Sequence, residues 1–373
     1  MIGTLPTTEN AVHRLTKTPM LKKKILLLWS PLADYTMACF QKLSEREDIE
    51  LYIIYQRTES NAPYHHFDLD FFKKVYIYTK EAEKQLDDFC MSLQPDIILM
   101  ASWNYPFYMS VARRSRKNGT YVISTFDGQW RATLKQKIGI LVSPFFLKPA
   151  IDNFFVPGDR QANFARKLGY KNPLLGFYSA YTERFKNITR NRISRKFLFV
   201  GRLVPIKGIA NLVEAYKEYR RSTNDPWELT IVGIGHLSSL CKDVEGIVMK
   251  DFVQPQDLPE IFSDAICLVL PSFFEPWGLV IHEAVTSGLP VICSHECGGL
   301  TMFVRDGQNG YIINTDTPSL VRAMKQMSAK TNEELREMSA ASRLLGSLWT
   351  TDTWTDYVYK YICSHSRKIT AAV

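Results

Sequence analysis

The sequence lacks several features that define common classes of protein. Its seven cysteines are scattered and include no Cys-x-x-Cys pair, so we expect no metal site and no disulfide framework, and a reducing cytoplasm suits the chain. No apolar run approaches the roughly 18 residues that span a bilayer. Residues 1–19 are polar, whereas a secretory leader has an apolar centre. These absences predict a cytoplasmic protein.

A glycine-rich turn is also lacking after the first predicted strand. Residues 25–29 (ILLLW) read as a buried strand of a parallel sheet, and the turn that follows is SPLADY. A dinucleotide-binding fold needs Gly-x-Gly-x-x-Gly there, because the backbone must approach a pyrophosphate. The sequence therefore argues against a nicotinamide or flavin oxidoreductase.

Positive charge is concentrated in the first half of the chain. Residues 1–180 carry 24 Lys and Arg against 17 Asp and Glu, whereas residues 181–373 carry 22 against 21. Such an excess implies an acidic partner, which could be a membrane surface, a phosphorylated substrate or nucleic acid. No nucleic-acid-binding motif supports the last of these, so we expect no nucleic-acid partner.

Strand-like and helix-like segments alternate in two series. The first series has predicted strands at 25–29, 51–55, 75–78, 96–100 and 120–125, and the second at 197–201, 229–233, 247–252, 267–271 and 290–294. The pattern breaks near 176–187, which indicates a linker. Alternation of this kind predicts an α/β fold with two doubly wound, Rossmann-like domains. We assign them to residues 1–180 and 181–350, with a further helix in 351–373.

Residues 131–157 mix basic and large apolar side chains. One interpretation is an interfacial segment that lies on a membrane or binds an acyl-linked acceptor. The other, which we favour, is a core helix followed by a loop and a buried strand.

Two anion-binding sites are predicted at the carboxyl ends of strands in the second series. Glu275 lies in the loop after one strand, and Glu283 lies about one turn into a helix that starts near 277–279. The first-turn amides of that helix can hold an anion. Arg202 and Lys207 follow an earlier strand and can clamp a diphosphate. The alternatives are an ordinary loop and surface charge beside a helix.

These motifs together resemble a known family. Gly201-Arg202, Lys207-Gly208 and the Glu275-x7-Glu283 spacing are similar to the retaining glycosyltransferases of family 4, and the match is strong over about 195–325. The resemblance implies the GT-B fold, in which two Rossmann-like domains face a cleft. It also implies that the helix around Trp354 crosses back onto the N-terminal domain.

The resemblance assigns roles to matching positions. It implies that Arg202 and Lys207 hold the donor diphosphate, that Glu283 accepts hydrogen bonds from the ribose, and that Glu275 contacts the donor sugar. The remaining positions are the backbone at Gly201, the amides of Trp277, Gly278 and Leu279 beside the sugar and phosphate, and Asp251, Phe252 and Val253 near the base. No metal and no cofactor other than the donor is expected.

The N-terminal half departs from the family pattern at two points. Ser30-Pro31 stands where many members have a glycine pair, and Asp127 stands where many have a histidine near the sugar. Asp127 could orient a hydroxyl or stabilise positive charge at the anomeric carbon; the change could equally mean weak or lost activity.

The expected function is transfer of a hexose, with retention of configuration, from a nucleotide sugar to a hydroxyl acceptor. We expect a UDP-hexose such as UDP-glucose as donor and a carbohydrate or lipid-linked acceptor, in polysaccharide or glycolipid biosynthesis. The basic first half suggests peripheral contact with anionic membrane, at its inner face. A nucleotide-sugar epimerase and a catalytically inactive nucleotide-sugar-binding protein are the alternatives.

Overall fold

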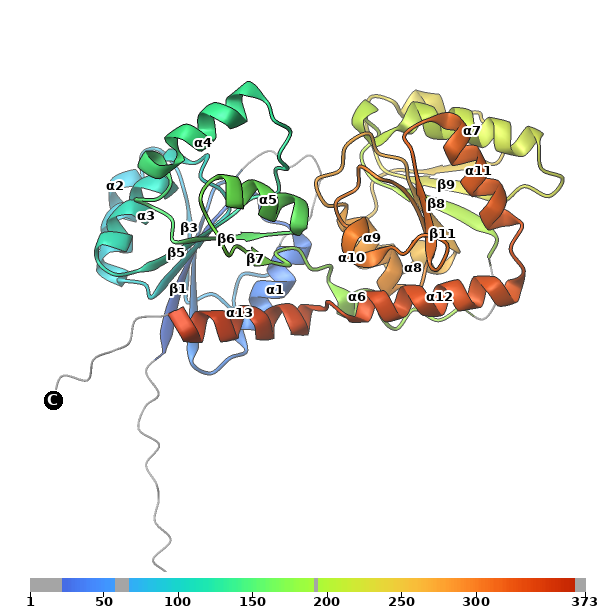
Figure 1. The fold of residues 1–373 in the computed structure, drawn as a ribbon. Coiled ribbons are helices and arrows are strands. Elements are labelled where there is room, and N and C mark those ends of the chain that lie inside the picture. Colours follow the sequence, from blue (N-terminus) through green and yellow to red (C-terminus); the bar gives the residue numbers. More distant parts are fainter. Residues whose placement is uncertain (1–21, 58–66, 191–193, 366–373) are drawn as a thin grey trace, which may run out of the picture.

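A computed structural model describes residues 22–57, 67–190 and 194–365. Residues 1–21, which we assigned to the first domain, lie outside this range. The chain forms two α/β domains, each built on one parallel sheet with helices on both faces (Figure 1). This arrangement confirms the predicted fold class.

The N-terminal sheet has seven strands in the order β3-β2-β1-β4-β5-β6-β7, and every pair is parallel. Its strands are β1 (Lys23–Trp29), β2 (Ile49–Tyr55), β3 (Lys74–Ile77), β4 (Ile97–Met100), β5 (Tyr121–Thr125), β6 (Asn153–Val156) and β7 (Leu174–Leu175). Its helices are α1 (Asp34–Ser44), α2 (Glu83–Leu93), α3 (Pro106–Lys117), α4 (Leu134–Phe146) and α5 (Asp159–Lys167).

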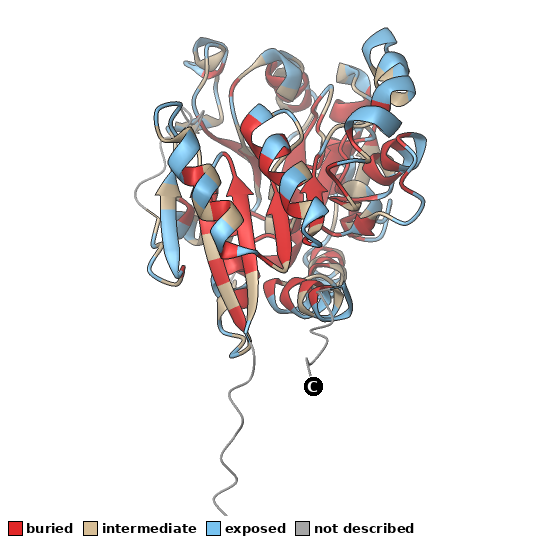
Figure 2. Cartoon of the chain, turned by 90° about the vertical axis from the view of Figure 1, so that its left-hand side faces the viewer, coloured by how far each residue is buried: buried red, intermediate tan, exposed pale blue. Residues whose placement is uncertain are grey.

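The central strands of this sheet are buried on both faces. In β1, Ile25, Leu26, Leu27 and Leu28 are at most 1% exposed, and Figure 2 shows buried strands between helices whose outer sides are exposed. A strand covered on both faces needs a continuous apolar run, which explains why the ILLLW pattern was recognisable.

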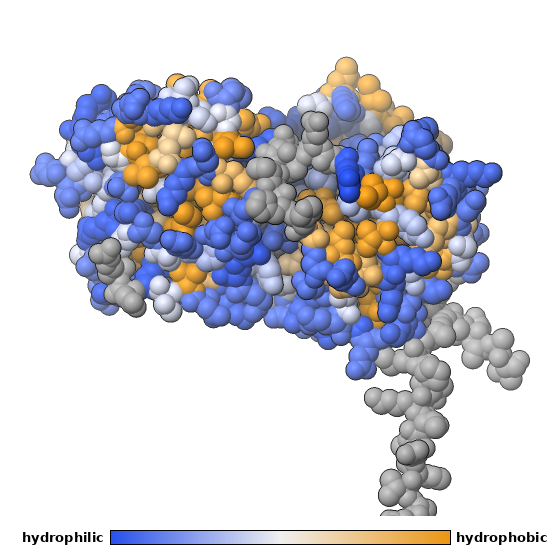
Figure 3. All heavy atoms as spheres, turned by 180° about the vertical axis from the view of Figure 1, so that it is seen from behind, coloured by the Kyte–Doolittle hydropathy of each residue, from blue (hydrophilic) through white to orange (hydrophobic). Residues whose placement is uncertain are grey.

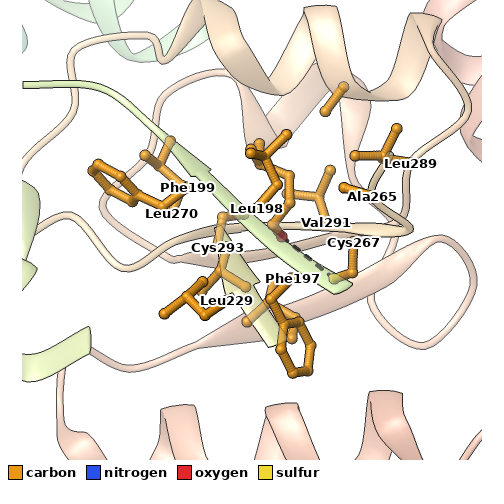
Figure 4. Close-up of a cluster of buried hydrophobic side chains, with 14 of the residues drawn as sticks. Phe197, Leu198, Phe199, Leu229, Ala265, Cys267, Leu270, Leu289, Val291 and Cys293 are labelled. Atoms are coloured by element: carbon orange, nitrogen blue, oxygen red, sulfur yellow. Dashed lines mark hydrogen bonds between the residues drawn. The ribbon is translucent and has the colours of Figure 1, made fainter. Parts of the chain in front are cut away.

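The C-terminal sheet has six parallel strands in the order β10-β9-β8-β11-β12-β13. They are β8 (Lys196–Val200), β9 (Glu228–Val232), β10 (Ile247–Lys250), β11 (Cys267–Leu270), β12 (Val291–Ser294) and β13 (Gly310–Ile313). Its α-helices are α7 (Ile209–Arg221), α8 (Leu258–Ser263), α9 (Leu279–Thr286), α10 (Leu300–Phe303), α11 (Thr317–Ser328) and α12 (Asn332–Ser347). Short 3-10 turns are η1 (Pro205–Lys207), η2 (Ser238–Cys241) and η3 (Pro255–Asp257). Figure 4 shows part of the core, with buried side chains from β8, β9, β11 and β12.

Two segments join the domains. The linker contains the short helix α6 (Thr182–Phe185), and α13 (Thr351–His365) follows α12 along the lower side of the molecule in Figure 1. Helix α13 packs on the N-terminal domain: Trp354 lies between Phe40 and Phe155, and its indole N–H donates to the carbonyl of Phe177 at 2.9 Å. The expected crossing of this helix onto the first domain is confirmed.

The favoured interpretation of residues 131–157 as a core helix is wrong in one respect. A helix and a buried strand are present, as α4 and β6, but within α4 only Ser143 is buried. Apolar composition alone does not tell a core helix from one that carries its apolar side chains outward. Across the described residues, no helix has both the length and the apolar character to cross a membrane.

Candidate active site

A cavity of about 330 Å³ opens where the carboxyl ends of β8, β9 and β11 face the start of α1 in the other domain. Parallel α/β sheets place their ligands at this edge. The cavity is lined by Asp34, Tyr35, Val200, Gly201, Arg202, Lys207, Val232, Gly233, Ile234, Phe252, Val253, Pro255, Leu258, Glu275, Gly278, Leu279, Val280 and Glu283.

The loop after β8 brings two cations to this cavity. Arg202 lies two residues after the end of β8 and is exposed, and no carboxylate in the described ranges forms a salt bridge with it. Lys207 ends the turn η1, and Gly208 follows in the left-handed region with φ 72°. A Cβ at Gly208 would lie 2.3 Å from the carbonyl oxygen of Pro271, so only glycine lets this loop pack against the end of β11.

Lys207 reaches a carboxylate of the neighbouring loop. Its ammonium group forms an ion pair with Glu275, whose residue is 8% exposed. Gly278, at φ 82°, lets the chain turn from this loop into α9, and a Cβ there would meet the Cγ of Glu275 at 2.9 Å. The two predicted anion-binding loops therefore form one site.

Helix α9 contributes its first turn and Glu283. Gly278, Leu279 and Val280 line the cavity, and the first N–H groups of a helix have no partner within it. The pKa of Glu283 is raised to about 7, chiefly by burial and then by the nearby Asp34 carboxylate, while Arg184 opposes the shift. Glu283 can thus exist in either protonation state near neutral pH.

The linker holds the N-terminal side of the cavity in place. Arg184 forms an ion pair with Asp34, and the backbone N–H of Ala180 donates to Nδ1 of His282 at 3.0 Å. Burial lowers the pKa of His282 to about 4, so this ring is neutral and carries its proton on Nε2. The residue next to Glu283 therefore anchors the linker.

The loop before α9 is also held from across the cleft. The carbonyl oxygen of Pro276 accepts hydrogen bonds from the side-chain amides of Gln161, at 2.7 Å, and Gln129, at 3.2 Å. Gln161 also donates to the backbone oxygen of Asp127 at 3.1 Å, and Arg160 donates to the carbonyl of His295 at 2.6 Å. These bonds fix the Glu275 loop relative to the N-terminal domain.

The structure does not bring every predicted residue into the cavity lining. Nine of the predicted positions line it: Gly201, Arg202, Lys207, Phe252, Val253, Glu275, Gly278, Leu279 and Glu283. Trp277 has a buried side chain that packs near Phe303, with ring centroids 6.1 Å apart. Asp127 accepts a 3.4 Å hydrogen bond from the hydroxyl of Tyr178, and burial raises the pKa of its carboxyl group.

Sequence reasoning missed the residues contributed by the N-terminal domain. Asp34 and Tyr35 line the cavity and begin α1; they end the SPLADY segment, which was noted in the sequence only for its lack of glycine. Their position just after the first strand was a usable signal, because ligands collect at that end of a parallel strand. Tyr35 also packs against Tyr178, with ring centroids 5.4 Å apart.

Comparison with solved structures defines the class of fold. The chain superposes with a TM-score of 0.70 on sucrose-phosphate synthase from Thermosynechococcus elongatus, at 18% identity, over 92% of this chain and all of that one. It also superposes, with a TM-score of 0.70 and 15% identity over 92% of this chain, on Anabaena HepE solved in complex with UDP and glucose. The fold is GT-B.

Comparison of sequences finds similarity over the second domain. Residues 181–344 match the family described as "Glycosyl transferases group 1". A D-inositol 3-phosphate glycosyltransferase from Acidothermus cellulolyticus is 33% identical over 140 residues, which are 33% of this chain and 30% of that protein. The matches cover about a third of the length of the first such relatives. Arg202, Lys207, Glu275 and Glu283 all lie within the segment that matches this family.

Proposed function

We propose that this protein is a glycosyltransferase that moves a hexose from a nucleotide sugar to a hydroxyl acceptor, with retention of anomeric configuration. One observation carries the proposal: two cations, the first turn of α9 and two carboxylates converge on a single cavity between the domains. This combination suits a ligand that has both phosphate and hydroxyl groups.

We propose the following division of roles in donor binding. Arg202 and Lys207 hold the diphosphate, together with the amides at Gly278 and Leu279, and offset the charge that develops as it leaves. Glu283, in its ionised form, accepts hydrogen bonds from the ribose hydroxyls. Phe252 and Val253 line the cavity and contact the base in this proposal. These cationic groups supply the charge stabilisation for which other transferases use a metal, so we expect transfer to persist in the presence of a chelator.

The Lys207–Glu275 ion pair suggests how donor binding alters the site. A diphosphate at Lys207 competes with Glu275 for the same ammonium group. Once Lys207 contacts the phosphate, the Glu275 carboxylate becomes available as a hydrogen-bond acceptor for the sugar hydroxyls. The acceptor hydroxyl then attacks from the face that the diphosphate leaves, and a phosphate oxygen accepts its proton.

A UDP-hexose is the donor we propose, and a carbohydrate or lipid-linked hydroxyl is the acceptor, in polysaccharide or glycolipid biosynthesis on the cytoplasmic side of a membrane. HepE, which shares the fold, was solved with UDP and glucose, and this supports the choice of base and sugar class.

A thermal-shift screen of UDP-, GDP- and ADP-sugars tests the donor. A ligand at 100 times its dissociation constant adds about 2.7 kcal/mol of stability. Incubation of the best ligand with candidate acceptors, followed by NMR of the anomeric proton, tests the reaction. We expect a product with the anomeric configuration of the donor. Stabilisation by no nucleotide sugar would contradict the proposal, as would an inverted product.

A second candidate function is a nucleotide-sugar-binding protein without turnover. Asp127 stands at the place of the family histidine and does not line the cavity, which favours this alternative. It predicts a thermal shift with a nucleotide sugar but neither transfer nor hydrolysis. An epimerase is distinguished by the same NMR experiment, because it converts its donor without an acceptor.

A further inference from the structure

Helix α4 carries an apolar stripe that faces solvent. Five large apolar side chains recur at the spacing of one helical face, and their exposed fractions are Leu134 74%, Ile138 51%, Leu141 74%, Val142 48% and Phe145 83%. In Figure 3, which shows the molecule from behind, hydrophobic residues project from the upper edge of the N-terminal domain, where α4 lies in Figure 1. Soluble proteins rarely expose so compact an apolar group without a binding role.

The opposite side of α4 attaches the helix to its own domain. Ser143 is buried, and its hydroxyl group hydrogen-bonds to the carbonyl of Leu168 at 3.1 Å; Gln136 and Ile140 are half-buried. At about 100° per residue, these three positions lie across the helix axis from the stripe. The exposed apolar side chains are therefore not needed to attach α4 to the core, because the opposite face of the helix makes that contact.

The charge around the stripe has one sign. Lys135 and Lys137 flank it on its two sides, and Arg131 and Lys148 lie near its two ends. The sequence contains no Asp or Glu between Asp127 and Asp152. Apolar side chains bordered by basic ones are typical of helices that lie in the headgroup region of an anionic bilayer. A second copy of this face would meet like charges, which disfavours self-association through it.

Helix α4 is tied to the loop that borders the cleft. The side chain of Gln136 accepts from the backbone N–H of Arg131 at 2.8 Å and donates to the carbonyl of Gln129 at 2.7 Å. Gln129 in turn donates to the carbonyl of Pro276, beside the cavity. Side-chain hydrogen bonds therefore connect α4 to the loop that borders the cavity.

We propose that α4 is a membrane-docking helix whose partner is an anionic phospholipid bilayer. The stripe enters the boundary between headgroups and acyl chains, while Lys135 and Lys137 contact lipid phosphates. The docking itself does not require the proposed transferase activity. The inference that the acceptor is carried by the membrane does rest on that activity, since docking would bring such an acceptor to the cleft.

Vesicle flotation of the whole chain tests the proposal, with vesicles of phosphatidylcholine alone and of phosphatidylcholine mixed with phosphatidylglycerol. We expect the protein to float with the mixed vesicles and to bind them at least tenfold more weakly at high salt. The double variant Leu141→Ser/Phe145→Ser should lose at least tenfold in partitioning. Lys135→Gln/Lys137→Gln should lose most of the preference for the anionic vesicles.

The matched control changes exposed leucines elsewhere. Leu344 and Leu348, on and just after α12, are 66% and 59% exposed, and Leu344→Ser/Leu348→Ser should float like the wild type. Thermal shift with UDP-glucose, without vesicles, checks the fold and the donor site of each variant separately. The proposal is overturned by equal flotation of the α4 variant and the wild type. It is also overturned if the wild type binds neither vesicle, and a dimer in light scattering that the α4 variant lacks would then identify a second copy as the partner.

Discussion

At the scale of single residues, Arg202 and Lys207 are the clearest test of the phosphate site. Both line the cavity, and both sit in a loop outside the sheet. If they hold the diphosphate, replacing either with alanine removes charge stabilisation at the leaving group, and turnover should fall by about 2–4 kcal/mol in activation free energy. Steady-state rates and calorimetric titration with UDP measure the two effects. Unchanged kinetics in both variants would remove these residues from the mechanism.

Glu275 and Glu283 differ in the part of the donor that each is proposed to contact. Glu283→Gln should weaken both UDP and UDP-glucose, because both contain the ribose. Glu275→Gln should lower turnover but leave UDP affinity unchanged or slightly raised, since it frees Lys207 from its ion pair. The amide keeps the side-chain volume, so folding should be little affected. An equal loss of UDP affinity in both variants contradicts this division.

The raised pKa of Glu283 predicts that donor binding depends on pH. Below about pH 7 the free protein holds a proton on this carboxyl group, and that proton must leave before the ribose hydroxyls can donate to it. Affinity for UDP-glucose should therefore rise about tenfold from pH 6 to pH 8. UDP-glucose is the suitable ligand, because its diphosphate does not titrate in this range.

Glu283→Gln is the control for this pH dependence, and its affinity should be nearly constant over the same range. The raised pKa of Glu283 also affects the stability of the fold. The folded state binds this proton more tightly than the unfolded chain, in which the pKa of the carboxyl group is near 4.5. The contribution of Glu283 to stability is therefore lost as pH rises from about 4.5 to about 7. A wild type whose UDP-glucose affinity is independent of pH would show that Glu283 does not contact the donor in its ionised form.

At the scale of elements, Gly208 fixes the distance between the loops after β8 and β11. Gly208→Ala introduces a Cβ 2.3 Å from the oxygen of Pro271, whereas Gly307, at nearly the same φ of 73°, has open space around it. Gly307→Ala should cost only the strain of placing alanine in the left-handed backbone region, about 1–2 kcal/mol of stability. Gly208→Ala should cost more stability. It should also weaken UDP binding, because relief of the contact with Pro271 displaces the neighbouring Lys207.

Urea unfolding and calorimetric titration of both alanine variants make this comparison. Equal stability losses with unchanged UDP affinity would show that the packing of Gly208 against Pro271 does not position Lys207.

Elements could be predicted from the sequence where one local pattern decides them. The strands β11 and β12, predicted at 267–271 and 290–294, each differ from the prediction by one residue at one end, because each is a short buried apolar run. The two-residue strand β7 is too short to leave a pattern. The predicted environment of α4 was wrong, because an apolar helix face has the same sequence pattern whether it packs on a core or faces solvent.

The residues of the candidate site also fall into a part that was predictable from the sequence and a part that was not. Its C-terminal half was predictable, since successive loops of one parallel sheet meet at one edge. The positions of Asp34 and of Gln161 depend on how one domain sits on the other, and no local pattern records that. The pairing of Lys207 with Glu275, 68 residues apart, likewise requires the packed structure.

At the scale of the whole molecule, Trp354 connects a segment beyond the second domain to the core of the first. It is 1% exposed and packs against Phe40 and Phe155. Trp354→Ala should cost about 3–5 kcal/mol, and hydrogen exchange should rise in β1, α1 and β6 rather than in the C-terminal sheet. Leu348→Ala, at an exposed position, is the control. Faster exchange confined to residues 196–347 would contradict this assignment.

The position of α13 also has a consequence for the order in which the chain is made. A ribosome adds about 5–20 residues per second, so the N-terminal domain waits on the order of ten seconds or more before Trp354 emerges. During that time the aromatic residues Phe40, Phe155 and Phe177 lack the contact that Trp354 of α13 supplies. Nascent chains stalled before residue 351 should therefore bind a trigger-factor-type or other holding chaperone at these residues and release it once α13 has been synthesised.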